Sequence, residues 1–239
     1  MKAVILAAGV GKRLWEVTQH RPKCLIEIGG RSLLRRYLES LASVGIRRAE
    51  IVVGYKQEMI RAAVEQDSCG VNVTFLVNDQ FHRGSISSLW IARTALDDDT
   101  IVMDADVLFH PDILRRLVSS SSENALLMDE TVKQTGEECM VVVTGGRVIA
   151  LTKNMPDQYD YAGEGVGFLR VRHADTPHVV SSLRGYIDRG SWGMEYEDAL
   201  RQYFQDVRVG YERIGGLPWT EIDFIEDVRK AELEVLPRL

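Results

Sequence analysis

Short apolar runs alternate with amphipathic helical patterns through the first half of the chain. A short continuous apolar run is typical of a strand buried on both faces of a parallel sheet, while apolar residues three and four apart indicate a helix. Strand and helix in this alternation predict βαβ units and a doubly wound α/β sheet. The expected strands are residues 2–6, 49–55, 71–79 and 100–109, and the expected helices between them are residues 31–46, 56–66 and 87–96.

The pattern changes in the second half of the chain. Residues 137–153 predict a β-hairpin, with Gly145 and Gly146 at its turn. No internal repeat, low-complexity tract or linker interrupts the sequence, so we predict a single domain over residues 1–239. The other elements expected here are strands at residues 164–171 and 207–214 and helices at residues 178–190, 196–206 and 224–235.

Composition and charge narrow the classes of partner. The 239 residues are 45% hydrophobic and 27% charged, as in an ordinary globular protein, and the formal net charge is −6. An acidic chain is not a general binder of nucleic acid or of anionic membranes, although a local group of cations can still bind an anion. We therefore expect neither nucleic acid nor a membrane among the partners.

The cysteines and the apolar segments indicate a compartment. Cys24, Cys69 and Cys139 are far apart in sequence and form no C-x-x-C pair, which favours reduced thiols. The apolar start at residues 1–6 is too short for a signal peptide, and no segment approaches the length of a membrane span. The sequence therefore predicts a cytoplasmic protein.

The stretch LAAGVGKRL, residues 6–14, is a candidate phosphate-binding loop because it follows the first strand directly. It matches neither G-x-G-x-x-G nor G-x-x-x-x-G-K-[ST]. Gly9 and Gly11 alone favour a plain βα turn with solvated charges. Lys12, Arg13 and the nearby Lys23 add three cations at one strand end, and together they predict a triphosphate cradle.

Two acidic spots are candidates for the other side of such a site. Asp104 and Asp106 lie at the end of the strand expected at residues 100–109, where they share a face if the strand is regular. Glu221 and Asp223 precede the C-terminal helix. Carboxylates together with phosphate oxygens are what Mg²⁺ prefers. The alternatives are that Asp104 caps a turn and that Asp223 is the N-cap of the last helix.

Four motifs carry a family resemblance, namely KAVILAAGVGKRL, RPKCLIEIGGRSLL, DADVLF and GLPWTEIDFIEDV. Together they resemble the sugar-phosphate nucleotidyltransferase superfamily over residues 1–232. Within it the chain is most similar to small bacterial CTP-dependent cytidylyltransferases that act on phosphocholine, inositol 1-phosphate or aminoalkylphosphonates. The resemblance implies a Rossmann-like, GT-A-like, three-layer α/β/α fold with a mostly parallel mixed sheet and a small β-hairpin excursion. Residues 1–118 would mainly bind the nucleotide, and residues 119–239 would supply the acceptor half and the C-terminal helix.

Transferred residue by residue, the resemblance implies a role for each matching position. The backbone of residues 6–9 would line the nucleoside, and residues 84–88 would read the base. The implied nucleotide-binding residues are Leu6, Ala7, Ala8, Gly9, Gly11, Lys12, Arg13, Lys23, Gly84, Ser85, Ser88 and Asp104. The implied catalytic residues are Arg13, Lys23 and Asp106, and the implied ligands of a Mg²⁺ cofactor are Asp106 and Asp223.

The second half offers candidate acceptor-binding residues, Glu164, Tyr196, Glu197 and Trp219. Carboxylates and aromatic rings suit an ammonium group through charge pairing and cation–π attraction. The alternatives are that Tyr196 belongs to the core of an amphipathic helix and that Trp219 only packs beneath the metal loop.

The function expected is Mg²⁺-dependent transfer of CMP from CTP to a phosphate or phosphonate acceptor such as phosphocholine or 2-aminoethylphosphonate, with release of pyrophosphate. The partners expected are CTP and this small acceptor, and the protein would be a monomer or a homodimer. One alternative is a sugar-1-phosphate nucleotidyltransferase that uses UTP, GTP or dTTP. The other is a non-catalytic nucleotide-sensing regulatory protein.

Overall fold

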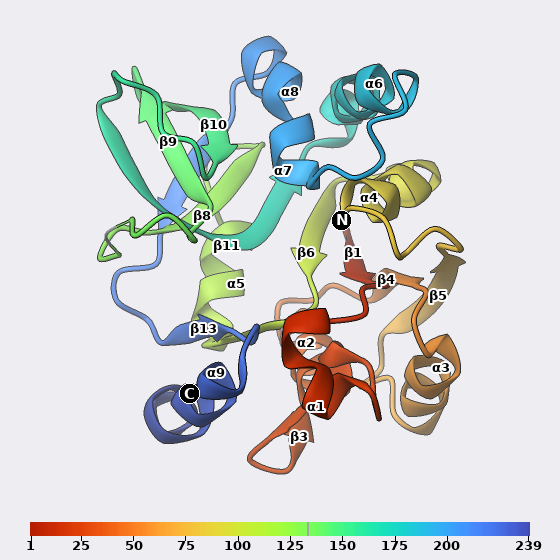
Figure 1. Cartoon of the computed structure of the whole chain (residues 1–239). Coiled ribbons are helices and arrows are strands. Elements are labelled where there is room, and N and C mark those ends of the chain that lie inside the picture. Colours follow the sequence, from red (N-terminus) through yellow and green to blue (C-terminus); the bar gives the residue numbers. More distant parts are fainter. Residues whose placement is uncertain (133) are drawn as a thin grey trace.

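The computed structural model describes residues 1–132 and 134–239, in which a nine-stranded mixed sheet lies between two layers of helices (Figure 1). Four strands of the first half form its parallel part, in the order β6-β1-β4-β5. They are β1 (Lys2–Ala7), β4 (Arg48–Val53), β5 (Asn72–Val77) and β6 (Thr100–Asp104). Parallel strands end at the same sheet edge, so the loops after β1 and β6 meet there.

The second half of the chain extends the same sheet. Its longest strand, β11, runs antiparallel to β6, β8 and β9. The first part of β11 pairs with β9 and its last part with β6, and its register against β8 shifts between Gly165 and Leu169. The strands of this half are β8 (Ala125–Asp129), β9 (Met140–Thr144), β10 (Arg147–Thr152), β11 (Tyr161–Val171) and β12 (Gly210–Arg213).

Helices cover both faces of the sheet (Figure 1). One apolar core lies under α2 (Leu33–Ser43), α3 (Gln57–Gln66), α5 (Pro111–Val118) and α9 (Ile225–Lys230). The other lies under α4 (Ile86–Ala92), α6 (Thr176–Ile187), α7 (Tyr196–Ala199) and α8 (Arg201–Asp206).

Strand β1 contributes to both cores because its side chains alternate. Ala3 and Ile5 lie in the first core and Val4 in the second, and none of these side chains is exposed. Burial of an aliphatic side chain such as Ile5 stabilises the fold by about 1.5–3 kcal/mol. The first strand is thereby fixed in the middle of the molecule, and the glycine loop that follows it begins at a rigid point.

Short elements complete the molecule around the sheet edge. They are α1 (Trp15–Thr18), the β2–β3 hairpin (Glu27–Ile28 and Arg31–Ser32), β7 (Val107–Phe109) and β13 (Trp219–Glu221). Strand β13 pairs antiparallel with β7 in a ribbon of its own, which brings the C-terminal segment beside the end of β6.

The three-layer α/β/α fold with a mixed sheet and a β-hairpin in the second half is confirmed. The hairpin is β9–β10, and its turn residues Gly145 and Gly146 have φ of 58° and 68°, which only glycine adopts readily. The hydroxyl of Ser32 accepts a hydrogen bond from the Arg35 N–H at 3.2 Å, as expected of the N-cap of α2. Because β11 adds directly to β6, the two halves of the chain share one sheet; their division into nucleotide and acceptor parts stays a prediction.

Two expected elements are interrupted. The strand expected at residues 100–109 is two strands, because after Asp104 the chain leaves the sheet and β7 pairs with β13. The helix expected at residues 196–206 is divided at Leu200, whose ψ of 2° is not helical. An apolar run shows that a segment is buried and does not reveal which partner it pairs with. Helix α5 and strand β8 were not among the expected elements.

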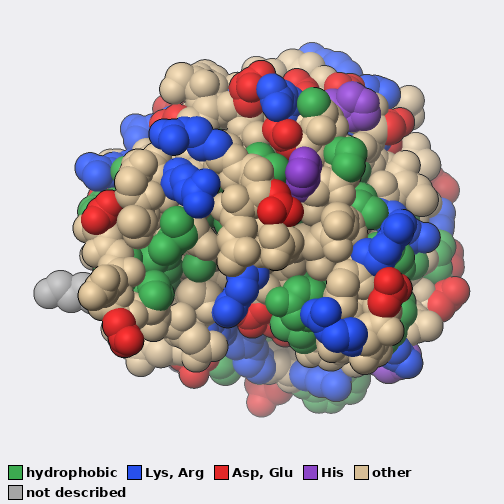
Figure 2. Space-filling view, turned by 90° about the horizontal axis from the view of Figure 1, so that it is seen from above, with side chains coloured by type: hydrophobic (Ala, Val, Ile, Leu, Met, Phe, Trp, Pro, Cys, Tyr) green, Lys and Arg blue, Asp and Glu red, His purple; other side chains and the backbone are tan. Residues whose placement is uncertain are grey.

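The surface gives no sign of a broad basic face on the side shown in Figure 2, where Lys and Arg side chains lie interspersed with Asp and Glu. Among the described helices, none combines the length and the apolar character that a membrane crossing needs.

Candidate active site

A cavity of about 830 Å³ opens where the loops after β1 and β6 meet. Ligands of open α/β sheets bind at this edge, outside the carboxyl ends of parallel strands. Ala8 is not among the residues that line the cavity, and its side chain is 1% exposed and packs in the second core; the predicted contact of its backbone with a nucleoside stays a prediction. The other predicted site residues all line it, namely Leu6, Ala7, Gly9, Gly11, Lys12, Arg13, Lys23, Gly84, Ser85, Ser88, Asp104, Asp106, Glu164, Tyr196, Glu197, Trp219 and Asp223.

In the glycine loop, Gly11 is required by the turn, and Gly9 leaves open space beside the backbone. Gly11 has a φ of 67°, and a Cβ there would lie 2.9 Å from the Thr18 methyl carbon. The Thr18 hydroxyl donates to the Gly11 carbonyl at 3.0 Å, which fixes the turn. Beside Gly9 no atom lies within 4 Å of the position a Cβ would take, so a ligand can approach the backbone there. Lys12 and Arg13 follow in an exposed 3₁₀ turn.

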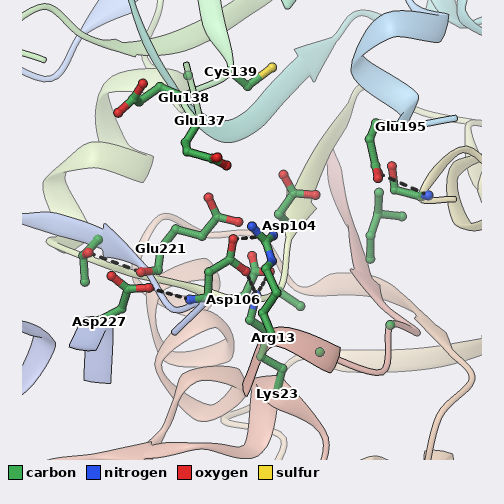
Figure 3. A pocket seen from close by; sticks show the side chains of 18 of the residues that line it. Arg13, Lys23, Asp104, Asp106, Glu137, Glu138, Cys139, Glu195, Glu221 and Asp227 are labelled. Carbon is green, nitrogen blue, oxygen red and sulfur yellow. Dashed lines mark hydrogen bonds and ion pairs between the residues drawn. The ribbon is translucent and has the colours of Figure 1, made fainter. Parts of the chain in front are cut away.

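Lys23 lies between two carboxylates from distant parts of the chain. Its Nζ donates to Asp106 Oδ2 at 2.7 Å and also to Asp223 Oδ1 (Figure 3). Burial acts to lower the pKa of Lys23, but Asp106 and Asp223 outweigh burial, so the pKa is raised and the ammonium stays charged. Arg13 pairs with the other oxygen of Asp223 at 2.5 Å, and its guanidinium lies 5.3 Å from the centre of the Phe224 ring.

Three carboxylates form a group that could hold a metal ion. Asp106, Glu221 and Asp223 each place one oxygen within 4.8 Å of the others. Asp106 Oδ1 is buried and has no hydrogen-bond partner among the described residues, which leaves it available to a cation. Burial, together with Asp106 and Asp223, raises the pKa of Glu221 to about 8. The carboxylate donors and the excess of negative charge therefore fit a hard divalent cation.

Glu221 was not among the predicted ligands, although the sequence contained a signal for it. Glu221 belongs to β13, and Asp223 follows two positions later in the same extended segment. Residues two apart on an extended chain point to the same side. The motif that identified Asp223 thus also brings Glu221 to the group.

Asp223 is not the N-cap of the last helix, and the Asp104 side chain pairs with a tyrosine instead of capping a turn. The carboxylate that accepts the backbone N–H groups before α9 is that of Asp227, at 2.9 Å from Asp223 N and 2.7 Å from Phe224 N. Asp104 accepts a hydrogen bond from the Tyr196 hydroxyl at 2.9 Å. Because β6 ends at Asp104, the condition for Asp104 and Asp106 to share one strand face is not met, yet both carboxylates line the cavity.

The second half of the chain lines part of the cavity with carboxylates, among them Glu164 and Glu197, and we name this part the acidic wall. Burial, with Glu138 and Asp129 nearby, raises the pKa of Glu164 to about 7. Burial likewise raises the pKa of Glu197 to about 7, and its Oε2 has no hydrogen-bond partner within the described part of the chain. A ligand group with positive charge would lower the cost of these buried carboxylates.

The two predicted aromatic residues are each held by an acidic partner. Tyr196 is 2% exposed and packs in the second core, while its hydroxyl reaches Asp104. Trp219 donates from Nε1 to Asp129 Oδ2 at 2.8 Å and lines the cavity. The core interpretation of Tyr196 therefore holds for its ring, while its polar end belongs to the site. Asp129, at the end of β8, and Glu137 and Glu138, before β9, also line the cavity, and no sequence motif identified them as site residues.

Comparison with known proteins identifies the family. Residues 3–158 match the MobA-like NTP transferase domain family. The chain is 28% identical, over 99% of its length, to CMP-5'-(3-aminopropyl)phosphonate synthase of Streptomyces rubellomurinus, and it spans 39% of that protein. It is 25% identical to CTP:phosphoglutamine cytidylyltransferase of Campylobacter jejuni, with 95% of this chain and 98% of that protein covered.

A solved structure agrees with the fold. The chain superimposes on CTP:phosphocholine cytidylyltransferase from Streptococcus pneumoniae with a TM-score of 0.75 and 24% identity, over 97% of both chains. These matches confirm the resemblance to nucleotidyltransferases that the four sequence motifs indicated. Since the family match spans well over half of its residues, the chain belongs to the family of MobA-like NTP transferase domains.

Proposed function

We propose that the protein is a Mg²⁺-dependent cytidylyltransferase that transfers CMP from CTP to a small phosphate or phosphonate acceptor. One observation carries the proposal: a single cavity joins a glycine loop bearing Lys12 and Arg13, the buried cation Lys23, and the carboxylate group of Asp106, Glu221 and Asp223. Cations and free backbone N–H groups suit the phosphates of a nucleotide, and carboxylates suit the divalent cation that accompanies them.

The metal ligands in this proposal are Asp106 and Asp223, with Glu221 as a third carboxylate within reach. When bound, Mg²⁺ supplies neutralisation of charge on the nucleotide phosphates and the leaving pyrophosphate. The preference for Mg²⁺ over softer metals follows from the all-oxygen donor set.

The chain's own residues position the reactants and stabilise charge. The acceptor attacks with an oxygen that is already anionic, so no protein group has to remove a proton. The new bond joins this oxygen to the α-phosphorus, the bond between the α-phosphorus and the bridging oxygen breaks, and its electrons leave with pyrophosphate. Lys12 and Arg13 hold the phosphates, and Lys23 stabilises the charge that develops on the α-phosphoryl group.

The base and the acceptor are proposed on different grounds. Cytosine is proposed because two relatives that align over 99% and 95% of this chain are named as a CMP-phosphonate synthase and a CTP-dependent cytidylyltransferase. The acceptor is proposed to carry a positive tail, as in phosphocholine or 2-aminoethylphosphonate, because Glu164, Glu197 and their neighbours form an acidic wall in the same cavity as the cations. The anionic end of the acceptor would then face Lys23, and its positively charged tail would face the acidic wall.

The protein is proposed to act in the cytoplasm, as a monomer or homodimer. Its three cysteines are free thiols, which supports a reducing compartment.

A substrate matrix tests the proposal. Pyrophosphate release is measured with Mg²⁺ and each of CTP, UTP, GTP and dTTP against phosphocholine, 2-aminoethylphosphonate, inositol 1-phosphate and glucose 1-phosphate. The proposal expects turnover with CTP and an amine-bearing acceptor. Turnover only with UTP, GTP or dTTP and the hexose phosphate would identify a sugar-1-phosphate nucleotidyltransferase. Tight nucleotide binding without turnover for any pair would identify the nucleotide sensor.

A further inference from the structure

The N-termini of α4 and α7 are joined to each other, although they lie in different halves of the chain. We name residues 84–86 and 192–196 the α4–α7 junction. Gly84 is required at this contact, since a Cβ there would lie 2.0 Å from the Met194 carbonyl oxygen. Two backbone hydrogen bonds cross the junction, from Gly84 N to Trp192 O at 2.9 Å and from Ile86 N to Met194 O at 3.2 Å.

Ser85 and Glu195 cap each other's helices across the junction. Ser85 is the N-cap of α4 and Glu195 the N-cap of α7, and within the described residues neither makes a side-chain cap to its own helix. The Ser85 hydroxyl oxygen accepts from the Tyr196 N–H at 2.8 Å. The Glu195 carboxylate accepts from the Ser85 N–H through Oε2 at 3.4 Å (Figure 3). Each helix start thus satisfies N–H groups that the other cannot pair internally.

The junction leads directly to the acidic wall of the cavity. Helix α7 has only four residues, so its position depends on contacts outside itself. Its first residue, Tyr196, is tied to Ser85 through its N–H and to Asp104 through its hydroxyl at 2.9 Å. Its second residue, Glu197, lines the cavity. On the other side of the junction, Gly84 and Ser85 line the same cavity.

We propose that the α4–α7 junction couples the nucleotide site to the acceptor site, with Ser85 as a positioning residue for α7. This inference rests on the proposed function, in which residues 84–88 meet the base and α7 meets the acceptor. A nucleotide that orders residues 84–88 orders Tyr196 and Glu197 through the hydroxyl of Ser85. Coupling of this kind is reciprocal, so acceptor binding strengthens nucleotide binding by the same factor.

Hydrogen–deuterium exchange tests the coupling without any acceptor. Exchange at residues 195–199 is compared with and without CTP and Mg²⁺ in the wild type, Ser85→Ala and Ser85→Thr. The proposal expects CTP to slow exchange there in the wild type and in Ser85→Thr, which keeps the hydroxyl, and not in Ser85→Ala.

Steady-state kinetics with 2-aminoethylphosphonate give the second readout. Loss of one hydrogen bond in Ser85→Ala should raise the KM for this acceptor at saturating CTP about three- to tenfold, and it should raise the KM for CTP at saturating acceptor by the same factor because the coupling is reciprocal. Ser43→Ala is the comparison variant, because the Ser43 hydroxyl donates to the Ser40 carbonyl at 2.7 Å in α2, away from the junction and from the cavity; its acceptor KM should equal that of the wild type.

The opposite results would overturn the inference. It is wrong if CTP fails to slow exchange at residues 195–199 in the wild type, or slows it equally in Ser85→Ala. It is also wrong if Ser85→Ala weakens CTP binding and leaves the acceptor KM unchanged, which would make Ser85 a base-reading residue. A wild type without turnover for every acceptor contradicts the proposed function, while the exchange comparison still decides the coupling.

Discussion

Lys23 is the internal counter-ion of two carboxylates that lie 83 and 200 residues away in sequence. The carboxylates it pairs, Asp106 and Asp223, are also the proposed metal ligands. A divalent cation that enters without nucleotide must displace an ammonium that is already bound there. Nucleotide phosphates offer Lys23 an alternative partner, so metal and nucleotide should bind together.

The variant Lys23→Gln tests this competition. Removal of the ammonium should tighten binding of Mn²⁺ to the nucleotide-free protein by about fivefold or more, because a unit charge about 4 Å away changes the interaction by roughly 1–4 kcal/mol. Titration followed by electron paramagnetic resonance measures the free Mn²⁺. Lys12→Gln, which removes an exposed cation of the glycine loop, is the charge-matched control. Equal Mn²⁺ affinities in Lys23→Gln and wild type would disprove the competition.

Glu164 makes stability depend on pH in a defined window. Burial raises its pKa from 4.5 to about 7, so the folded state binds a proton more tightly than the unfolded state. The stabilisation is full below about pH 4.5 and is lost as the pH rises towards 7. We expect the free energy of unfolding, measured in urea, to fall less steeply between pH 5 and 7 in Glu164→Gln than in the wild type. The exposed Glu65→Gln is the control, and a slope change as large in the control would refute the assignment.

At the scale of elements, the bend in β11 places Asp104. Gly167 has a φ of 78°, and a Cβ there would lie 2.6 Å from Asp104 Oδ2. The bend coincides with the point where β11 changes its register against β8. Glycine at this position therefore lets the strand pass close to the carboxylate that holds Tyr196.

Gly167→Ala and Gly146→Ala separate backbone strain from steric clash. Both residues have positive φ, so each alanine should cost about 1–2 kcal/mol of stability. Only at Gly167 does the new methyl group also meet Asp104, while the Cβ position at Gly146 has no atom within 4 Å. Gly167→Ala should therefore show the larger loss in urea unfolding. Equal losses would mean that Asp104 moves aside without cost.

Elements with a local signal could be predicted, and those defined by a distant partner could not. The turn at Gly145 and Gly146, the N-cap at Ser32 and the strand buried on both faces at residues 2–6 each depend on adjacent residues. By contrast, the break after Asp104 depends on the pairing of β7 with β13, more than 100 residues later. Hydrophobic periodicity carries no information about such a pairing.

At the scale of the whole molecule, the sequence motifs predicted which segments meet at the cavity but not the contacts that their side chains make with one another. The glycine loop and the segment of Asp106 meet because the parallel strands β1 and β6 end at one sheet edge, which the alternation of strands and helices implies. The segment of Glu221 and Asp223 reaches the same place through the pairing of β13 with β7. The direct contacts of Lys23 with Asp106 and Asp223, and the mutual caps of Ser85 and Glu195, need side-chain positions that no sequence pattern specifies.

The cavity has a cationic side and an acidic side. In the proposed function, Lys12, Arg13 and Lys23 bind the nucleotide phosphates and the acceptor's anionic end, and the acidic wall binds the acceptor's tail; all of these residues line the one cavity. The carboxylates of Asp106, Glu221 and Asp223, which could hold a metal ion, lie beside the cationic side of the cavity.

The most direct test follows the label of [α-³²P]CTP into product in the wild type and in Asp106→Asn. With Mg²⁺ and 2-aminoethylphosphonate or phosphocholine, the account predicts a labelled acceptor product in the wild type and a loss of about hundredfold or more in the variant, with circular dichroism unchanged. Near-normal labelling by a folded Asp106→Asn protein would contradict the assigned metal site, and label transfer from UTP alone would contradict cytidylyl transfer.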